Sequence, residues 1–117
     1  MQPDVQIPID RNGIVVQLFV EERPVLRVGR FMNRHYRVLE EALNEFGLSF
    51  RTEQRRNYNI PTLEGEKYKV VGMGLYVCMG NEILFRGKSL DYKIGINKEH
   101  LELCQYLILD KRLTCVD

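Results

Sequence analysis

This sequence of 117 residues has no tryptophan, only three cysteines and no long apolar run. Its apolar stretches are shorter than the ~18 residues needed for a membrane-spanning helix. The segment Met1–Asp10 lacks the basic and apolar regions of a secretory signal. We therefore expect no membrane partner and predict a cytoplasmic protein.

The cysteines are too few and too irregularly spaced for a disulfide framework or a zinc motif. Cys78, Cys104 and Cys115 are an odd number without C-x-x-C spacing, so we expect reduced thiols and no metal or other cofactor. His100 and Cys104 are four residues apart on a predicted helix, a spacing that a weak metal-binding pair would use. The alternative is an exposed histidine beside a core cysteine.

An excess of charge of one sign is also missing, because 17 Lys and Arg face 16 Asp and Glu. The field of the whole chain therefore attracts no polyanion, and any anion site has to be local. Gly87-Lys88-Ser89 lacks the first glycine of a P-loop, since Glu82 stands there. Gly72-Met73-Gly74 lacks the third glycine of a dinucleotide-binding fingerprint.

The apolar patterning predicts one α+β domain over residues 1–117, with a mixed, mostly antiparallel sheet of about six strands and two helices. Residues 1–10 form an extended N-terminal arm. Strands are predicted at 14–20, 25–28, 48–52, 67–79 and 82–86, an extended segment at 90–96 and helices at 31–46 and 98–109, and 53–66 reads as a long polar connection. The strand at 14–20 is nearly continuously apolar, as expected of a central strand buried on both faces.

The first helix has the clearest periodicity, with an apolar stripe of Met32, Tyr36, Leu39, Leu43 and Phe46. Asn33 is a candidate cap for its first turn, and Gly47 is placed to end it with a positive φ.

The second helix is predicted to begin after a cap at Asn97. Its expected inward residues are Leu101, Cys104, Leu107 and Ile108.

The long strand at 67–79 alternates, which puts Gly72 and Gly74 on one face together with Tyr68, Val70 and Tyr76. The two glycines leave a bare strip on that face. The strip either forms a cleft with the start of the first helix, where a ligand binds, or allows close packing of another segment.

The charge order of the first helix opposes its dipole. Basic residues precede acidic ones: Arg30, Arg34, His35 and Arg37 lie at the N-terminal end, and Glu40, Glu41 and Glu45 at the C-terminal end. A phosphate or carboxylate bound at the helix start would compensate. The alternative is a set of solvated side chains.

His35 lies in this basic setting, which favours the neutral imidazole. A neutral imidazole acts as a base or a nucleophile beside an electrophilic phosphorus. In this reading, Arg27, Arg30 and Arg34 neutralise the charge that develops on phosphate. The alternative is a surface histidine without a chemical role.

Short motifs over most of the chain resemble the janus family, which includes small protein-histidine phosphatases. The matching segments are Pro3-Asp4-Val5-x-Ile7, Asp10-x-x-Gly13-Ile14, Leu26-Arg27-x-Gly29, His35 entering a helix, Gly47 before a strand, Arg56 after it, and Lys69-Val70-Val71-Gly72. The resemblance implies that His35 is catalytic, that N–H groups around it help hold phosphate, and that the segment Gly72–Leu75 forms the opposite wall. The family's strand lysine falls near Val16 in this sequence, and the serine of its glycine loop is replaced around Gly74.

These observations predict a phosphate-recognising domain, acting on a phosphorylated protein or a small phosphate-bearing ligand. The predicted anion-binding residues are Arg27, Arg30, Arg34, Arg56, Gly72 and Gly74, and the predicted catalytic residue is His35. A second hypothesis is a non-enzymatic module that binds single-stranded RNA or DNA, because eight arginines between Arg23 and Arg56 are interleaved with aromatic residues. A protein-interaction module is a third hypothesis.

Overall fold

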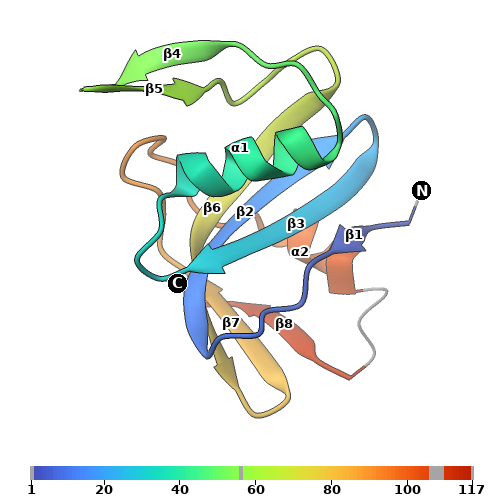
Figure 1. Cartoon of the computed structure of the whole chain (residues 1–117). Coiled ribbons are helices and arrows are strands. Elements are labelled where there is room, and N and C mark those ends of the chain that lie inside the picture. The colour runs from blue at the N-terminus through green and yellow to red at the C-terminus, as the bar shows by residue number, and fades with distance from the viewer. Residues whose placement is uncertain (1, 56, 106–109, 117) are drawn as a thin grey trace.

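A six-stranded sheet with one helix on each face organises the molecule. The structure is a computed structural model that describes residues 2–55, 57–105 and 110–116. Its elements are β1 (Asp4–Val5), β2 (Asn12–Val20), β3 (Arg23–Arg30), α1 (His35–Glu45), β4 (Thr52–Arg55), β5 (Tyr58–Pro61), β6 (Tyr68–Met79), β7 (Glu82–Arg86), α2 (Lys98–Gln105) and β8 (Arg112–Cys115) (Figure 1). The sheet order is β1-β3-β2-β6-β7-β8, and β4 and β5 form a separate pair. The two outermost strands run parallel to their neighbours and the inner pairings are antiparallel, which confirms the predicted α+β fold.

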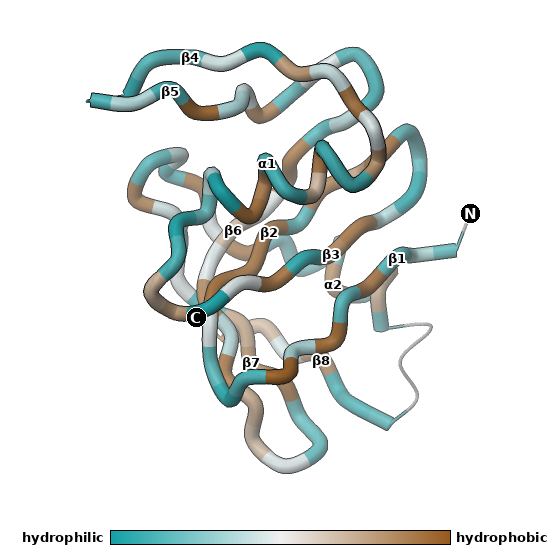
Figure 2. The backbone as a smooth tube through the Cα atoms, in the orientation of Figure 1, coloured by the Kyte–Doolittle hydropathy of each residue, from teal (hydrophilic) through white to brown (hydrophobic). Residues whose placement is uncertain are grey.

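Strand β2 lies at the centre and contributes to two hydrophobic cores. Ile14, Val16 and Leu18 pack with Leu39 and Leu43 of α1 on one face. On the other face, Val15 packs in a cluster that includes residues of α2 and β7. The apolar, brown-coloured stretch of β2 in Figure 2 lies between the two helices. Burial on both faces was predicted for this strand and is confirmed.

Helix α1 begins later than its apolar stripe suggests. Strand β3 continues to Arg30, and a turn closed by the Asn33 N–H donating to the Arg30 carbonyl (2.9 Å) precedes the helix. Met32 is therefore outside the helix and 89% exposed, so its predicted place in the stripe is wrong. Gly47 ends the helix with a φ of +66°, as predicted.

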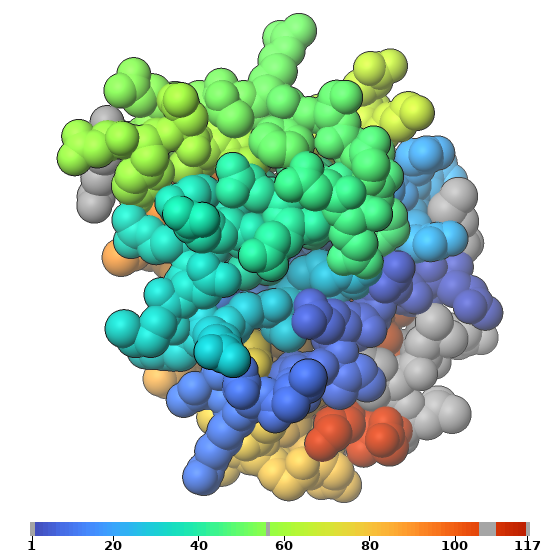
Figure 3. All heavy atoms as spheres, viewed as in Figure 1, coloured from blue at the N-terminus to red at the C-terminus, as the bar shows by residue number. Residues whose placement is uncertain are grey.

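The small sheet β4–β5 was not predicted. Residues 48–51 are not a strand, β4 starts at Thr52, and the predicted polar connection 53–66 contains both strands of the pair. Ile60 of β5 is fully buried in the α1 core. In the space-filling view (Figure 3), α1 and this pair hide much of the large sheet. The polar side chains of β4 obscured the strand pattern because only one face of this pair packs on protein.

Strand β6 contains a bulge that changes which residues share a face. Gln17 pairs with Gly72 and Leu18 pairs with Val70, so Val71 is the extra residue. Tyr68 and Val70 consequently pack in the α1 core, whereas Tyr76 packs in the α2 core. The predicted single face for Tyr68, Val70 and the two glycines is therefore wrong, since a one-residue insertion reverses the alternation.

The segment between β7 and α2 is a loop and not the expected extended segment at 90–96. Tyr92 anchors this loop because its buried hydroxyl donates to the Pro61 carbonyl (2.6 Å). Asn97 then caps α2 through its side-chain oxygen, which accepts from the His100 N–H (2.9 Å), as predicted. Leu101 and Cys104 point into the core as predicted, whereas Leu107 and Ile108 lie outside the described residues.

The two ends of the chain add strands at the edges of the sheet. Asp4 and Val5 of the predicted extended arm pair with β3, and β8, which the sequence pattern did not reveal, pairs with β7. Within the part of the chain that the structure describes, neither helix is long and apolar enough to cross a membrane.

Candidate functional site

The candidate site lies at the start of α1, where His35 is the first helical residue. Its Nε2 lies 2.8 Å from the Gly74 carbonyl oxygen. A carbonyl only accepts, so in the neutral ring Nε2 carries the proton and Nδ1 keeps its lone pair. Burial lowers the pKa of His35, and this lowering prevails over the opposing effect of the Gly74 hydrogen bond. The histidine is therefore set up as a neutral imidazole with a basic Nδ1.

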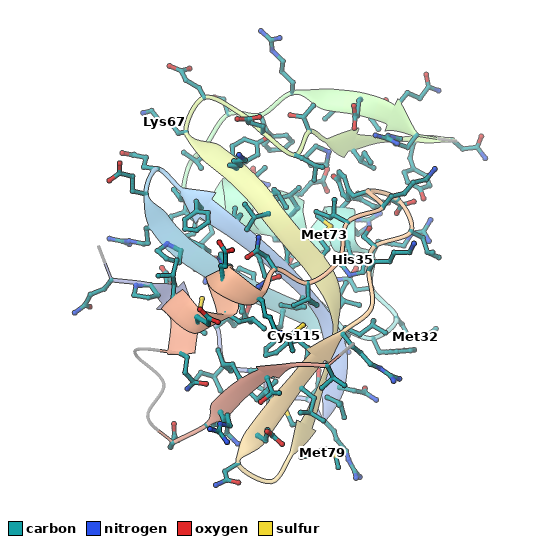
Figure 4. All side chains as sticks on the ribbon, turned by 180° about the vertical axis from the view of Figure 1, so that it is seen from behind. Met32, His35, Lys67, Met73, Met79 and Cys115 are labelled. Atoms are coloured by element: carbon teal, nitrogen blue, oxygen red, sulfur yellow. The ribbon has the colours of Figure 1, made fainter. Side chains whose placement is uncertain are left out.

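Gly74 lies in the part of β6 that pairs with β2 but not with β7. Strand β7 pairs with β6 only from Leu75 to Met79, and beyond Arg86 the chain leaves as the β7–α2 loop. The uncovered edge of β6 is taken by this loop, where Gly95 accepts from the Met73 N–H (3.0 Å). Gly74 pairs with Val15 of β2, and its carbonyl also accepts from His35. The site is thus built where α1, β6 and the loop meet (Figure 4).

The first turn of α1 offers unpaired backbone donors. The cap residue is Arg34, without a capping side chain, and Asn33 instead accepts from the Arg34 N–H (2.9 Å), so the proposed cap at Asn33 is wrong. The N–H groups of His35 and Tyr36 have no acceptor among the described residues. The first turn also contains no acidic side chain. Such a helix start attracts anions.

Arg34 is tied to two other elements at the edge of the site. Its guanidinium lies over the Tyr58 ring, 5.2 Å from the centroid, and donates to the Tyr58 hydroxyl. That hydroxyl donates in turn to Asp91 Oδ1 (3.0 Å) in the β7–α2 loop. Tyr36 stacks on Tyr58 with ring centroids 5.0 Å apart. Sequence reasoning did not predict that Tyr58 and Asp91 are linked to α1, because this link depends on the fold.

The structure also brings together two basic segments that are far apart in the sequence. Residues 30–37 and 86–96 carry six basic side chains and one acidic one, a net charge of +5, which leaves −4 for the rest of the chain. The basic residues are all exposed: Arg30, Arg34, Arg37, Arg86, Lys88 and Lys93. Lys88 and Lys93 were not predicted as site residues. The two segments that border His35 therefore carry an excess of positive charge in a near-neutral chain.

Arg27 does not belong to this region. It is buried, its Nε and Nη2 donate to the two carboxylate oxygens of Glu45 (3.0 and 2.7 Å), and Nη2 also pairs with Asp4 (2.9 Å). These hydrogen bonds lower the pKa of Glu45. The structure thus uses Arg27 to join β1 and β3 to the end of α1, in place of the predicted anion contact. Arg56 lies outside the described residues.

The bare strip at Gly72 and Gly74 is a packing device. A Cβ on Gly72 would come within 2.1 Å of Gln17 Oε1, and one on Gly74 within 2.6 Å of the Arg86 carbonyl and of Ile96. The segment before α2 therefore covers the strip, and the alternative of an open ligand cleft is wrong. Gly74 contributes to the site only through its carbonyl, which orients His35.

The second histidine is structural. His100 is 1% exposed, so the expected exposed position is wrong. Its Nε2 donates to the Leu18 carbonyl (2.9 Å), and its Nδ1 faces the Cys104 thiol (3.6 Å). Burial raises the pKa of Cys104 to about 12. Among the described residues, no group of three His, Cys, Asp or Glu could hold a metal.

No protein-family model matches the chain, and no curated protein matches it. The resemblance to the janus family thus rests on the short motifs in the sequence. Val16, near which the family's strand lysine falls, is fully buried in the core. In this chain the positive charge next to His35 comes from another position, Arg34.

Proposed function

We propose that this protein is a janus-like, phosphate-recognising domain that hydrolyses phosphohistidine in a metal-independent reaction with His35 as base or nucleophile. The observation that carries the proposal is the His35–Gly74 hydrogen bond, which leaves Nδ1 as the basic nitrogen at the start of α1. The net charge of +5 on the two segments around it supports an anionic substrate.

Both roles of His35 use the same atom. As a base, Nδ1 takes a proton from water while the water oxygen bonds to phosphorus and the P–N electron pair leaves with the substrate nitrogen, which takes up a proton. As a nucleophile, Nδ1 bonds to phosphorus while the substrate P–N bond breaks and its electron pair leaves with the substrate nitrogen, which takes up a proton. Water then attacks phosphorus, and the new P–N bond breaks to release phosphate and free His35. Backbone N–H groups of α1 and the exposed basic side chains would offset the charge on the phosphoryl oxygens.

The test is turnover of a phosphohistidine peptide in the presence of a chelator. His35→Ala is expected to lower turnover by ~10²-fold or more, the range of general acid–base catalysis. Circular dichroism of the variant controls for folding. Acid-labile labelling of the wild type at His35 would select the nucleophilic role. Undiminished turnover in a folded His35→Ala variant would reject the mechanism, and phosphate binding without turnover would restrict the function to recognition.

A second candidate function is binding of single-stranded nucleic acid, favoured by the stack of Tyr36 on Tyr58. Arg34 and Arg37 lie over these two rings, 5.2 Å from the Tyr58 centroid and 5.7 Å from the Tyr36 centroid. Aromatic and guanidinium planes of this kind contact bases in single strands. Fluorescence anisotropy with a labelled oligonucleotide tests the idea, and a lack of binding even at low salt removes it.

A further inference from the structure

Three large apolar side chains are exposed on the two segments that border His35. Phe31 and Met32, 56% and 89% exposed, lie in the turn before α1, and Leu90, 78% exposed, lies in the β7–α2 loop. Figure 4 shows Met32 and His35 on the same side of the molecule as this loop. We call Phe31, Met32 and Leu90, with the basic side chains Arg30, Arg34, Lys88 and Lys93, the docking face.

Contacts in the structure hold the two segments of the docking face next to each other. The loop packs on β6 beside Gly74, where Gly95 accepts from Met73 (3.0 Å), and Gly74 accepts from His35. On its other side, Asp91 accepts from Tyr58, which accepts from Arg34. Leu90 precedes Asp91 in this loop, so the exposed apolar side chains lie on two segments that are linked through the residues around His35.

A small phosphate ester would need the basic groups but not these apolar ones. Single exposed apolar residues are ordinary, but here they accompany six exposed basic residues around one neutral imidazole. Methionine and leucine on loops adapt to apolar side chains of a partner. The positive charge requires that the partner also be anionic.

We propose that the docking face binds a segment of a phosphorylated protein that carries apolar residues on either side of its phosphorylated residue. The inference rests on the proposed function, because the phosphoryl group would lie at His35. In an extended segment, residues advance by ~3.3 Å each, so apolar residues within a few positions of the phosphorylated one reach both loops. Phe31 and Met32 contact one flank and Leu90 the other.

The experiment compares three probes in turnover and anisotropy assays. The probes are a phosphohistidine peptide with leucine flanks, the same peptide with serine flanks, and phosphoramidate as a small P–N compound. The wild-type protein is expected to prefer the leucine peptide by ~10-fold, the effect of ~1.4 kcal/mol of apolar contact. Met32→Gln and Leu90→Gln should each reduce this preference and leave phosphoramidate turnover unchanged.

Met79→Gln is the matched control. Met79 is 59% exposed at the end of β6, and Figure 4 shows it far from Met32 and His35. The same substitution there should leave all three probes unaffected. Because Met32 and Met79 are both exposed, neither change is expected to unfold the protein.

Several results would overturn the docking proposal without touching the proposed function. One is equal turnover of both peptides by the wild type. Another is a Met32→Gln variant that loses the same fraction of turnover on all three probes. A third is a Met79→Gln variant that loses as much of the preference for the leucine peptide as Met32→Gln does. If an oligonucleotide displaces the leucine peptide from the wild type but binds the Met32→Gln variant more weakly, the docking face binds nucleic acid instead. Failure of the proposed function is distinguishable, because no probe would then be hydrolysed and the leucine peptide would bind equally with and without its phosphoryl group.

Discussion

The side chain of Gln17 illustrates how single residues satisfy a polar interior. Gln17 is fully buried on the central strand β2. Its amide accepts from the Asn97 N–H (2.8 Å), donates to the Asn97 carbonyl (2.9 Å) and lies 3.3 Å from His100 Nδ1. Within the described residues, no buried side-chain nitrogen or oxygen lacks a partner. These bonds join the start of α2 to β2. Separating the two elements would leave buried polar groups unpaired, which costs free energy.

Burial of the two histidines makes the stability of the fold depend on pH. Burial lowers the pKa of His35 and of His100 below the ordinary value of 6.5. Below that value the unfolded chain binds a proton that the folded chain does not, so the free energy of unfolding falls as pH drops from 6.5 toward the folded pKa values. For buried His100 the slope is at most about 1.4 kcal/mol per pH unit. Chemical denaturation at several pH values measures this fall.

Nuclear magnetic resonance titration of the two imidazoles checks the cause. Both should titrate below 6.5, and His35→Gln should remove one of the two curves and part of the acid sensitivity. Ordinary titration near 6.5 at both positions would contradict the burial argument. The activity proposed for His35 should decline over the same acidic range, since protonation occupies Nδ1.

At the scale of elements, α1 is held by one face of its helix and by its two ends. Val38, Leu39, Ala42 and Leu43 are its buried residues. Its first residue, His35, donates a hydrogen bond to Gly74 of β6, and its last residue, Glu45, accepts from Arg27 of β3. Because both ends of the helix are attached to strands of the large sheet, the basic residues at its start have a defined position.

Substitutions before and after the start of α1 should have different effects on the free energy of unfolding, because one residue is exposed and the other is buried. Leu39 is fully buried, so Leu39→Ala is expected to lower the free energy of unfolding by ~2–5 kcal/mol. Met32 is exposed, and Met32→Ala should change it by less than about 0.5 kcal/mol. Thermal or urea denaturation gives both numbers. Equal losses in the two variants would place Met32 in the core, against the structure.

For the whole molecule, the decisive property is the separation of charge that folding produces. A chain of net charge +1 gains a region of +5 when residues 30–37 and 86–96 come together, with −4 distributed over the remainder. Figure 4 shows Lys67 at the upper end of the molecule, away from His35 near its middle. An anionic partner is therefore attracted in one orientation, since the far side does not add to the attraction.

Charge reversal should show that this region binds anions. The double variant Lys88→Glu, Lys93→Glu is expected to weaken binding of a phosphohistidine peptide by ~10-fold or more at low salt, and added salt should narrow the difference by screening. The matched control is Lys67→Glu, Lys69→Glu, which reverses two exposed lysines at the distant start of β6. Equal effects of the two double variants would mean that only net charge matters and that no local anion site exists.

The elements that sequence reasoning predicted well are those with a local signal. The strands β2, β3, β6 and β7 and the cap at Asn97 all follow from apolar period or capping chemistry. The bulge at Val71 and the β4–β5 pair were missed because neither changes the composition around it. Met32 was misplaced because its spacing matches the helix stripe by coincidence, while β3 and a turn occupy that part of the chain.

The sequence by itself determined an α+β fold with two amphipathic helices, and it singled out His35 among basic residues. It could not show that Arg27 pairs with Glu45 and Asp4, or that the loop that carries Lys88 and Lys93 is linked to Arg34 through Asp91 and Tyr58. Periodicity reports which face of an element is apolar, because that depends on neighbours within one or two turns. Which charges pair and which remain free depends on contacts between distant segments, and only the tertiary structure decided these.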